Sequence, residues 1–484
     1  MHILDMIYYW ARTLPHRAAI IQNDSATTSV VSYQRLADTI ESIGERIDGL
    51  NLDKREPVAV CIAKPSLMLA TVFALLRSGY SAAPVNSRLY PRLAGAGLRN
   101  LIYDAEGQVT SGGRNIRFDG SWLPSPRQPA TTRAYRKRPT ENASLIFFTS
   151  GTTGLPKKVV QPAAALDQRL KYFSYASEAH QKVLVMPALA SAFGVLRVCE
   201  VLNLGKTAYF APESMAALSL INLFGVEVVI ASATQALALA ERKNKNPGYR
   251  TDSLKAIFVG GGKIESEGIA RIRTALCRNV INAYGSTETG TVALTPFDVL
   301  ADAPGAIALP WAELEVVDAA GLQLPAGAEG FVRIRTPELM ENIKAAGPSE
   351  IPGVRDDWFY PGDIGSLDAN GVLRLVGRGS DVINRGGVKV SGTRIEEILK
   401  AMPEISDAAA CGVAGASGLE EIWIAVVANG GVDIDGIKRH LGKHHDIRST
   451  PNEVFVVDRI PRGDLGKVQQ HRLKELLLGL KRGA

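Results

Sequence analysis

Two short segments of this 484-residue chain combine glycines, hydroxyl groups and a charge directly after an apolar run. The first follows Leu145–Phe148 and reads Thr-Ser-Gly-Thr-Thr-Gly-Leu-Pro-Lys. Glycine lets the backbone curl around an anion, and N–H groups, hydroxyls and a lysine supply donors and positive charge. The segment can therefore hold a polyphosphate. Its candidate contacts are Thr149, Ser150, Gly151, Thr152, Thr153, Gly154 and Lys157.

This loop differs from the P-loop of ordinary NTPases, which needs Gly-x-x-x-x-Gly-Lys-Ser/Thr running into a helix. Pro156 disfavours a helix at this point of the chain. Taken alone, a flexible surface turn has the same composition, so the loop by itself leaves both interpretations open.

The second segment, Tyr284, Gly285, Thr287 and Glu288, ends another apolar run. An aromatic ring can stack on a base, a glycine permits close approach, a hydroxyl can bond a phosphate, and a carboxylate can bind Mg²⁺. Ligand crevices of α/β sheets open at the carboxyl ends of strands, which is where we expect this segment. A plain strand-ending turn is the alternative.

The motifs resemble, in content and order, those of the adenylate-forming superfamily, which includes acyl-CoA synthetases, peptide-synthetase adenylation domains and luciferases. Further matches are Gly260–Lys263, Trp358–Asp363, the hinge-like run Gly377–Ser391 and the final Ile460–Lys467. The resemblance spans the chain from the helix near Leu36 to Lys467. It implies ATP, Mg²⁺ and coenzyme A as cofactors and substrates.

The resemblance also implies residue roles. Tyr284 would neighbour the adenine together with Gly261 and Gly262, Thr287 would contact the α-phosphate, and Glu288 would bind Mg²⁺. Asp363 would accept both ribose hydroxyls, as a carboxylate can, and Arg378 would contact the ribose. In the C-terminal part, the implied residues are the hinge Ser380, the thiol-route glycines Gly386 and Gly387, and Lys467, the lysine of the first half-reaction.

The expected acyl pocket draws on Ala190, Phe193, Gly194, Gly260 and Ala283. It is small and mostly apolar, which suits a short or medium aliphatic acid or a compact aromatic acid. Four positions depart from the family pattern: Lys158 replaces a glycine, Ala190 a histidine or aromatic residue, Pro361 a threonine, and Ser380 an aspartate or lysine.

The composition, with 46% apolar and 21% charged residues, is that of a globular protein. Lys and Arg number 55 against 49 Asp and Glu, a net charge of +6 that is mild for this length and does not argue for nucleic acid. No apolar run reaches the length of about 18 residues expected of a membrane span, and no secretory signal is visible. The four cysteines lie far apart, which predicts free buried thiols. We therefore expect a cytoplasmic protein.

Short runs rich in Val, Ile and Phe alternate with helical patterns, which is typical of an α/β fold. The expected strands are Val58–Ala63, Leu145–Thr149, Val183–Met186, Val226–Ile230, Leu254–Gly260 and Val280–Tyr284. Continuous apolar strands predict parallel pairing with both faces covered. The stretch Asp119–Asn142 is interpreted as a surface connection.

From about Ala312 the pattern alternates, which predicts an antiparallel β subdomain. The predicted fold is thus α/β, with a large N-terminal domain (1–378) of parallel-rich α/β subdomains plus this β subdomain. A small mobile α+β C-terminal domain (379–484) follows. His440 and His444 have a metal-compatible spacing but lack a nearby carboxylate, so a basic face is the preferred interpretation.

These features predict ATP-dependent activation of a carboxylic acid to an acyl-adenylate, followed by transfer to the thiol of coenzyme A. Two alternatives stay open. The acyl group could pass to the phosphopantetheine of a carrier protein acting in trans, since the chain contains no carrier domain. The chain could also be a nucleotide-binding regulator whose chemistry is impaired by the four departures.

Overall fold

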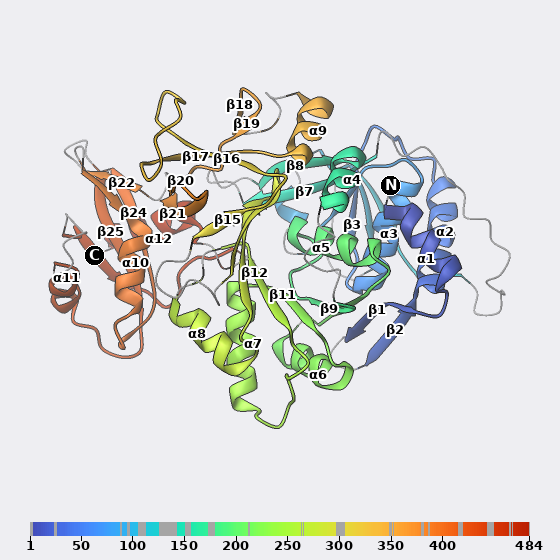
Figure 1. Ribbon diagram of the computed structural model, residues 1–484, viewed down its shortest axis with the longest axis horizontal. Helices are drawn as coiled ribbons and strands as arrows, with labels where there is room; N and C mark the ends of the chain where they lie inside the picture. Colours follow the sequence, from blue (N-terminus) through green and yellow to red (C-terminus); the bar gives the residue numbers. More distant parts are fainter. Residues whose placement is uncertain are drawn as a thin grey trace.

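The computed structural model describes residues 3–23, 27–87, 90–93, 97–104, 113–124, 143–150, 156–172, 180–211, 213–262, 264, 266–296, 305–347, 351, 353–378, 382–385, 388–414, 420–442, 450–463, 466 and 468–483. Within these ranges the chain forms a mixed α/β structure with two large and two small sheets. Figure 1 shows the N-terminal helices at one side, the large sheets in the middle and the C-terminal elements at the opposite side.

The first large sheet has the strand order β6-β5-β3-β4-β7-β8. Its pairs are parallel except for β7 and β8, which form an antiparallel hairpin. Its strands are β3 (Val58–Cys61), β4 (Ala82–Pro84), β5 (Asn100–Tyr103), β6 (Arg114–Arg117), β7 (Ser144–Ser150) and β8 (Pro156–Pro162). The helices of this region are α1 (Ile3–Thr13), α2 (Tyr33–Asp48), α3 (Pro65–Arg77) and α4 (Ala163–Tyr172), with 3-10 turns at Tyr90–Leu93 and Gly120–Trp122.

The second large sheet begins as a parallel α/β unit, in the order β1-β10-β9-β11-β12-β13, with β2 paired antiparallel to β1 at its edge. Its strands are β1 (Ala18–Asn23), β2 (Thr28–Ser32), β9 (Lys182–Val185), β10 (Thr207–Phe210), β11 (Val228–Ser232), β12 (Ala256–Gly260) and β13 (Val280–Ser286). The helices between them are α5 (Ala192–Asn203), α6 (Ser214–Phe224), α7 (Ala233–Lys245) and α8 (Ser266–Ala275).

After β13 the same sheet continues with antiparallel strands and becomes a β subdomain. These strands are β14 (Gly290–Pro296), β15 (Ala306–Ala308), β16 (Glu313–Val317), β17 (Glu329–Arg335), β18 (Val354–Arg355), β19 (Trp358–Phe359), β20 (Asp363–Leu367) and β21 (Val372–Arg378). Helix α9 (Pro337–Ala346) follows β17 and packs on α4 and β8.

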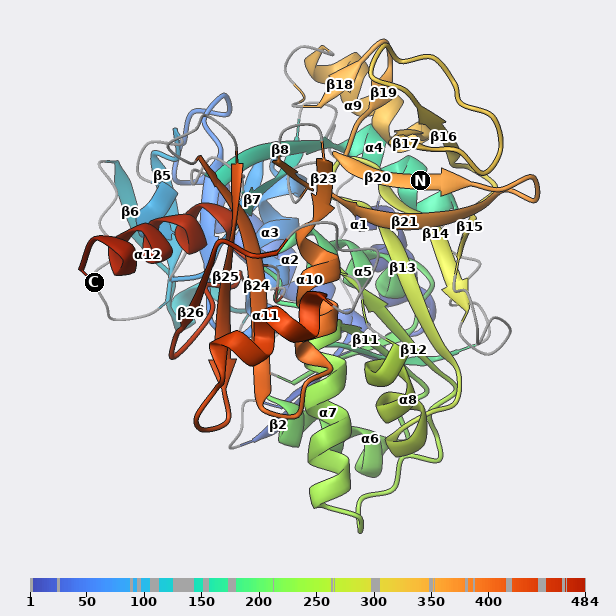
Figure 2. The ribbon, with the colours of Figure 1, turned by 90° about the vertical axis from the view of Figure 1, so that its left-hand side faces the viewer.

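The C-terminal segment has its own sheet, in the order β24-β25-β26, and the hairpin β22-β23. Its elements are β22 (Val382–Arg385), β23 (Val388–Ser391), α10 (Gly392–Lys400), β24 (Ile405–Ala414), β25 (Glu420–Ala428), α11 (Ile434–Gly442), β26 (Glu453–Val456) and α12 (Gln470–Gly483). Two hydrophobic clusters here draw all their residues from this segment. Figure 2 shows these elements grouped together in front of the large sheets.

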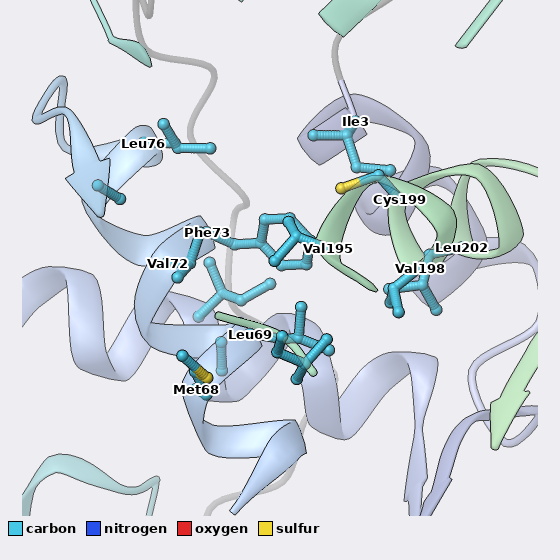
Figure 3. Packing of buried hydrophobic residues seen from close by; sticks show 14 of the residues in the cluster. Ile3, Met68, Leu69, Val72, Phe73, Leu76, Val195, Val198, Cys199 and Leu202 are labelled. Atoms are coloured by element: carbon cyan, nitrogen blue, oxygen red, sulfur yellow. The ribbon is translucent and has the colours of Figure 1, made fainter. Parts of the chain in front are cut away.

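The largest hydrophobic cluster lies where α1, α2, α3 and α5 meet the sheets. Helix α3 is apolar around its whole circumference, and such a helix is stable only when buried; Phe73 and Leu69 are indeed fully buried. Figure 3 shows Phe73 of α3 beside Val195 of α5, with Cys199 of the same helix near Ile3. This packing fixes the start of α5, which borders the site described below.

The six predicted strands are confirmed, with ends that differ by a few residues, and the helix expected near Leu36 is α2. The interpretation of Asp119–Asn142 as surface was partly wrong: Trp122 is buried and its ring lies 5.4 Å from that of Phe118, while residues 125–142 are outside the described ranges. All four cysteines are free, and Cys277 is half-buried rather than buried. None of the described helices is long and apolar enough to cross a bilayer.

Candidate active site

The carboxyl ends of β11, β12 and β13 lie side by side, as the sequence motifs require. In register, Ser232 pairs with Gly260, and Gly260 pairs with Ala283. A side chain at Gly260 would meet the Phe193 ring, because a Cβ there would lie 2.7 Å from Phe193 Cζ. The structure therefore brings together Phe193, Gly260 and Ala283, three of the five predicted acyl-pocket residues.

The other two pocket residues belong to the turn that starts α5. Ser191 caps this helix by accepting a hydrogen bond from Gly194 N at 3.1 Å. A Cβ at Gly194 would lie 2.3 Å from the Ala188 carbonyl oxygen, so only glycine fits this turn. Ala190 is half-buried in the same turn, immediately before the cap. Ser191 and Gly194 thus allow α5 to begin at this point, and the start of the helix sets the position of the Phe193 ring.

A hydrogen bond joins two of the predicted nucleotide residues, although they are 79 positions apart. The Tyr284 hydroxyl donates to Asp363 Oδ2 at 2.7 Å, and Asp363 is 8% exposed. Asp363 also pairs in register with Arg378, across β20 and β21. Tyr284, Asp363 and the backbone of Arg378 therefore occupy one corner of the sheet. Gly261, with a φ of +80°, makes the neighbouring turn after β12, and both Gly261 and Gly262 are half-buried.

The turn between β13 and β14 carries Thr287 and Glu288, and its backbone is held from inside the protein. Ser286 pairs with Gly290, which has a φ of +70°, so the turn itself is Thr287–Thr289. The three carbonyl oxygens of the turn each accept a hydrogen bond from a buried side chain. The donors are Gln161 to Thr287 at 2.7 Å, Asn342 to Glu288 at 3.2 Å and Thr336 to Thr289 at 3.4 Å.

The predicted phosphate loop is the connection of the β7–β8 hairpin. Thr149 pairs with Lys157 and Ser150 with Pro156, so a strand, and not the helix that Pro156 disfavours, follows the loop. Lys157 is exposed, and Lys158, which replaces the usual glycine, also lies in β8, opposite Phe148. Gln161, further along β8, ties this hairpin to the Thr287 carbonyl.

A buried group of charges lies beneath the turn, and the sequence motifs did not predict it. Arg169 Nε lies 2.9 Å from Glu200 Oε1 and its Nη1 lies 3.5 Å from Glu338 Oε2, while Arg197 Nη1 lies 2.9 Å from Glu200 Oε2. Burial raises the pKa of Glu338 to about 7, outweighing the opposing effects of Arg169 and of a hydrogen bond from Gln161. The available signal was Arg197 and Glu200, an ion pair at i, i+3 in the otherwise apolar helix α5.

Described residues on both sides of Lys467 contact one another, and Gly466 lies against the start of α7. Arg462 bridges to Val468, and its guanidinium binds both carboxylate oxygens of Asp407, at 2.6 and 2.9 Å, and the Gly466 carbonyl at 2.8 Å. Burial raises the pKa of Asp407, but the nearby charges of Arg462 and Lys400 outweigh this and hold that pKa below its usual range. A Cβ on Gly466 would lie 2.3 Å from Thr234 Oγ1, at the start of α7.

Several predicted site residues cannot be placed. Outside the described ranges are Gly151, Thr152, Thr153, Gly154, Ser380, Gly386, Gly387, Lys467 and His444. The side chains of Thr149, Ser150 and Arg378 are also not described, although their backbones are. Among the described residues, no group of three or more His, Cys, Asp or Glu could hold a metal ion.

The strand ends, the Tyr284–Asp363 hydrogen bond and the Thr287–Glu288 turn are arranged as expected for an adenylate-forming enzyme. A family model described as AMP-binding enzyme matches residues 7–343. The chain belongs to this family of AMP-binding enzymes.

Individual relatives are distant but cover almost the whole chain. The salicyl-AMP ligase / salicyl-S-ArCP synthetase of Mycobacterium tuberculosis is 27% identical over 520 residues, covering 96% of this chain and 88% of the relative. The 2-succinylbenzoate–CoA ligase of Bacillus licheniformis is 24% identical over 483 residues, covering 96% and 98%. The fold matches that of o-succinylbenzoate CoA synthetase from Bacillus subtilis in complex with the acyl-adenylate intermediate, with a TM-score of 0.82, 21% identity and 97% of each chain covered.

Proposed function

We propose that this chain is an ATP-dependent acid–thiol ligase. A carboxylate oxygen of the substrate attacks the α-phosphorus of ATP, and the bond to pyrophosphate breaks, which leaves an acyl-adenylate. The thiolate of coenzyme A then attacks the acyl carbonyl, and AMP leaves. The observation that carries the proposal is the hydrogen bond from Tyr284 to Asp363, because it unites two distant nucleotide motifs beside the expected acyl pocket.

Tyr284, Asp363 and Arg378 are assigned to the nucleoside. The Tyr284 ring would lie against the adenine while its hydroxyl holds the Asp363 carboxylate in a fixed orientation. A carboxylate held in this way can accept both ribose hydroxyls. Arg378, paired with Asp363 across the strands, would supply a further contact to the ribose. Gly261 and Gly262 leave room for the adenine beside the end of β12.

The phosphates are assigned to Thr149–Lys157 and to the Thr287–Glu288 turn. Thr287 would donate to the α-phosphate, and Glu288 would bind Mg²⁺. The residues present fit this ion, because Mg²⁺ with a nucleotide needs only one or two carboxylates and completes its shell with phosphate oxygens and water. Mg²⁺ supplies charge neutralisation of the phosphates when it is bound.

Lys467 is assigned to the first half-reaction. The carboxylate and the α-phosphate repel one another, and a cation between them lowers the barrier electrostatically. Gly466, the preceding residue, lies against Thr234 at the strand ends, which supports delivery of the lysine to this cleft. We propose that segment 379–484 then moves about Ser380, so that coenzyme A can reach the acyl group past Gly386 and Gly387.

The acyl pocket restricts the acid. The Phe193 ring fills the space above Gly260, and the Arg197 guanidinium lies 5.7 Å from the centre of that ring, from the buried side of the helix. At Ala190, the small side chain would leave the pocket more open than the histidine or aromatic ring that the family usually has there. We infer a short or medium aliphatic acid or a compact aromatic acid. An apolar pocket distinguishes single methylenes by only about 1–3 kcal/mol, so several neighbouring acids should react.

The decisive experiment is a pyrophosphate-release screen with Mg-ATP over aliphatic, aryl and dicarboxylic acids, with and without coenzyme A. The proposal expects release with a narrow group of acids and an acyl-CoA product only when coenzyme A is present. If none of the acids in the panel supports pyrophosphate release, the proposal is contradicted. ATP binding without turnover, measured by calorimetry, would favour the nucleotide-binding regulator instead.

The assignment of Lys467 is tested separately with the Lys467→Ala variant. Adenylation should be lost, because the variant lacks the cation in the first transition state, while transfer from supplied acyl-adenylate to coenzyme A should persist. Equal loss of both half-reactions would mean that the lysine is structural.

A carrier protein acting in trans is the second candidate acceptor. It is favoured by the similarity to a relative named as a salicyl-S-ArCP synthetase. Supplying preformed acyl-adenylate with either coenzyme A or a phosphopantetheinylated carrier protein, and comparing the transfer rates, separates the two acceptors.

A further inference from the structure

The turn that carries Thr287 and Glu288 has an unusual internal support. Backbone carbonyls at a strand-ending turn usually bond to water or to neighbouring backbone groups. Here three consecutive carbonyl oxygens each accept from a side chain of the N-terminal domain, and the three donor residues come from β8 and from the start and middle of α9. These donors, Gln161, Thr336 and Asn342, are only 1–2% exposed.

Burying a side-chain amide is unfavourable unless the amide forms hydrogen bonds. An amide removed from water without a partner costs about 1–3 kcal/mol, and an apolar side chain of the same size would avoid that risk. Gln161 donates its Nε2 to the Thr287 carbonyl at 2.7 Å. Asn342 donates its Nδ2 to the Glu288 carbonyl at 3.2 Å.

The support also connects separate parts of the site. Gln161 lies in β8, the strand that leaves the phosphate loop, where it pairs with Leu145 of β7. Asn342 lies on α9, which packs on α4 and β8, as Figure 1 shows at the top of the molecule. One glutamine and one asparagine therefore fix the turn relative to the hairpin that bears the phosphate loop.

The buried charged side chains contact the chain directly after the Thr287–Thr289 turn. A Cβ on Gly290 would lie 2.6 Å from Glu338 Oε2 and 2.8 Å from Arg169 Nη1, so this ion pair touches the end of the turn directly. Arg197 donates to Thr291 Oγ1 at 2.5 Å, one residue further along β14. The chain that follows Glu288 thereby lies against a buried, charged group.

We propose that Gln161 and Asn342 are positioning residues for Glu288 and Thr287. By holding the two carbonyl oxygens inward, they fix the peptide planes, and with them the directions in which the Thr287 hydroxyl and the Glu288 carboxylate leave the backbone. This inference rests on the proposed function, since it takes Glu288 as the Mg²⁺ ligand. The inference predicts that losing either amide raises the Mg²⁺ concentration needed for half-maximal activity more than it raises the KM for the acid.

The test compares Gln161→Met and Asn342→Leu with Gln22→Met as a matched control. Gln22 is another buried strand glutamine, 2% exposed, whose amide bonds Ser29 Oγ and Ser66 N far from the site. For each variant, pyrophosphate release is measured against Mg²⁺ at saturating ATP and acid. ATP binding is measured by calorimetry with and without Mg²⁺, and unfolding by thermal denaturation.

We expect Gln161→Met and Asn342→Leu each to raise the Mg²⁺ concentration for half-maximal release about fivefold, which corresponds to about 1 kcal/mol for one lost hydrogen bond. The KM for the acid should stay within twofold of wild type. Gln22→Met should lower the melting temperature similarly without changing the Mg²⁺ response. Equal Mg²⁺ responses in all three variants, or a shift confined to the acid KM, overturn the positioning role.

Failure of the proposed function is distinguishable from failure of this inference. If wild type binds ATP but releases no pyrophosphate, the ligase proposal fails, while the gain in ATP affinity on adding Mg²⁺ still reports on the turn. That gain should then shrink in Gln161→Met and Asn342→Leu and stay intact in Gln22→Met. An unchanged gain in both site variants contradicts the inference. If one site variant does not fold, the other decides.

Discussion

Gly466 offers a sharp test of whether the C-terminal segment closes on the central cleft during adenylation. In Gly466→Ala, the new methyl group would lie 2.3 Å from Thr234 Oγ1. This is roughly 1 Å closer than favourable carbon contacts allow, so the closed arrangement must shift. Overpacking of this kind costs about 1–3 kcal/mol, which predicts that adenylate formation slows about 5- to 150-fold.

The backbone makes a second, separable contribution. Gly466 has a φ of +78°, and a left-handed conformation costs a residue with a side chain about 1–2 kcal/mol. That cost applies wherever the loop keeps its shape, so it should appear as a lower melting temperature. The clash with Thr234, in contrast, exists only when the segment is closed.

Thr234→Ala separates the two effects. It removes Oγ1 and leaves the Cβ of residue 234, which lies 3.6 Å from the position that the new methyl group would take, an ordinary contact distance. The double variant should therefore recover most of the adenylation rate lost in Gly466→Ala, and Thr234→Ala alone should resemble wild type. The assay is single-turnover pyrophosphate release, with transfer from supplied acyl-adenylate as the internal control. Equal slowing of both half-reactions, or no rescue by Thr234→Ala, would refute the reasoning.

Three further changes probe the remaining contacts. Tyr284→Phe should raise the KM for ATP about tenfold, measured by pyrophosphate release, because Asp363 loses a charged hydrogen bond of about 1.5–3 kcal/mol. Glu338→Gln should gain thermal stability relative to wild type as the pH rises toward about 7, because only wild type must then ionise a buried carboxyl. Arg462→Met should slow adenylation more than thiol transfer in half-reaction assays, since its contacts to Asp407 shape the loop before Lys467.

The sign of the pH effect follows from proton binding. Between the ordinary carboxyl pKa of about 4.5 and the raised value of about 7, the folded protein holds a proton on Glu338 that the unfolded chain releases. Wild-type stability therefore falls across this interval and levels off above it, whereas Glu338→Gln lacks this contribution. A stability difference that is constant from about pH 5 to 8 contradicts the raised pKa. An unchanged KM for ATP in Tyr284→Phe would contradict the role of that hydrogen bond. Equal loss of both half-reactions in Arg462→Met would contradict a role of Arg462 in adenylation alone.

Local patterns in the sequence were sufficient to predict the strands and the positions of several candidate site residues at strand ends. Val280–Tyr284 and Leu254–Gly260 are mostly apolar runs, and the strands that they form, β13 and β12, pair parallel, so their carboxyl ends share one edge. Tyr284 and Gly260 end these two strands, so their proximity follows from topology. The prediction of a parallel strand covered on both faces was wrong for β13, which is largely half-buried and pairs antiparallel with β14 on its other side. Pro156 likewise indicated that no helix follows the phosphate loop directly, and the structure has the strand β8 there.

Contacts between distant segments were beyond the sequence patterns. Gln161 looks like any polar residue at a strand end, and only its partner, a backbone carbonyl 126 positions away, shows why an amide is buried there. The same holds for Asn342, for the Arg169–Glu338 pair and for Gly466 beside Thr234. Backbone acceptors carry no residue-type signal, and the ion pair and the Gly466 contact join segments far apart in the chain, so a single sequence contains no pattern from which these pairings can be deduced.

The most direct measurement uses a reactive acid from the screen with ¹⁸O in its carboxylate, incubated with the protein, Mg-ATP and coenzyme A. If the acid attacks the α-phosphorus and the thiol then attacks the acyl carbonyl, one ¹⁸O atom stays on phosphorus, and mass spectrometry will find it in AMP. Label in inorganic phosphate with ADP as the nucleotide product, or acyl-CoA formed with unlabelled AMP, would contradict an acyl-adenylate intermediate.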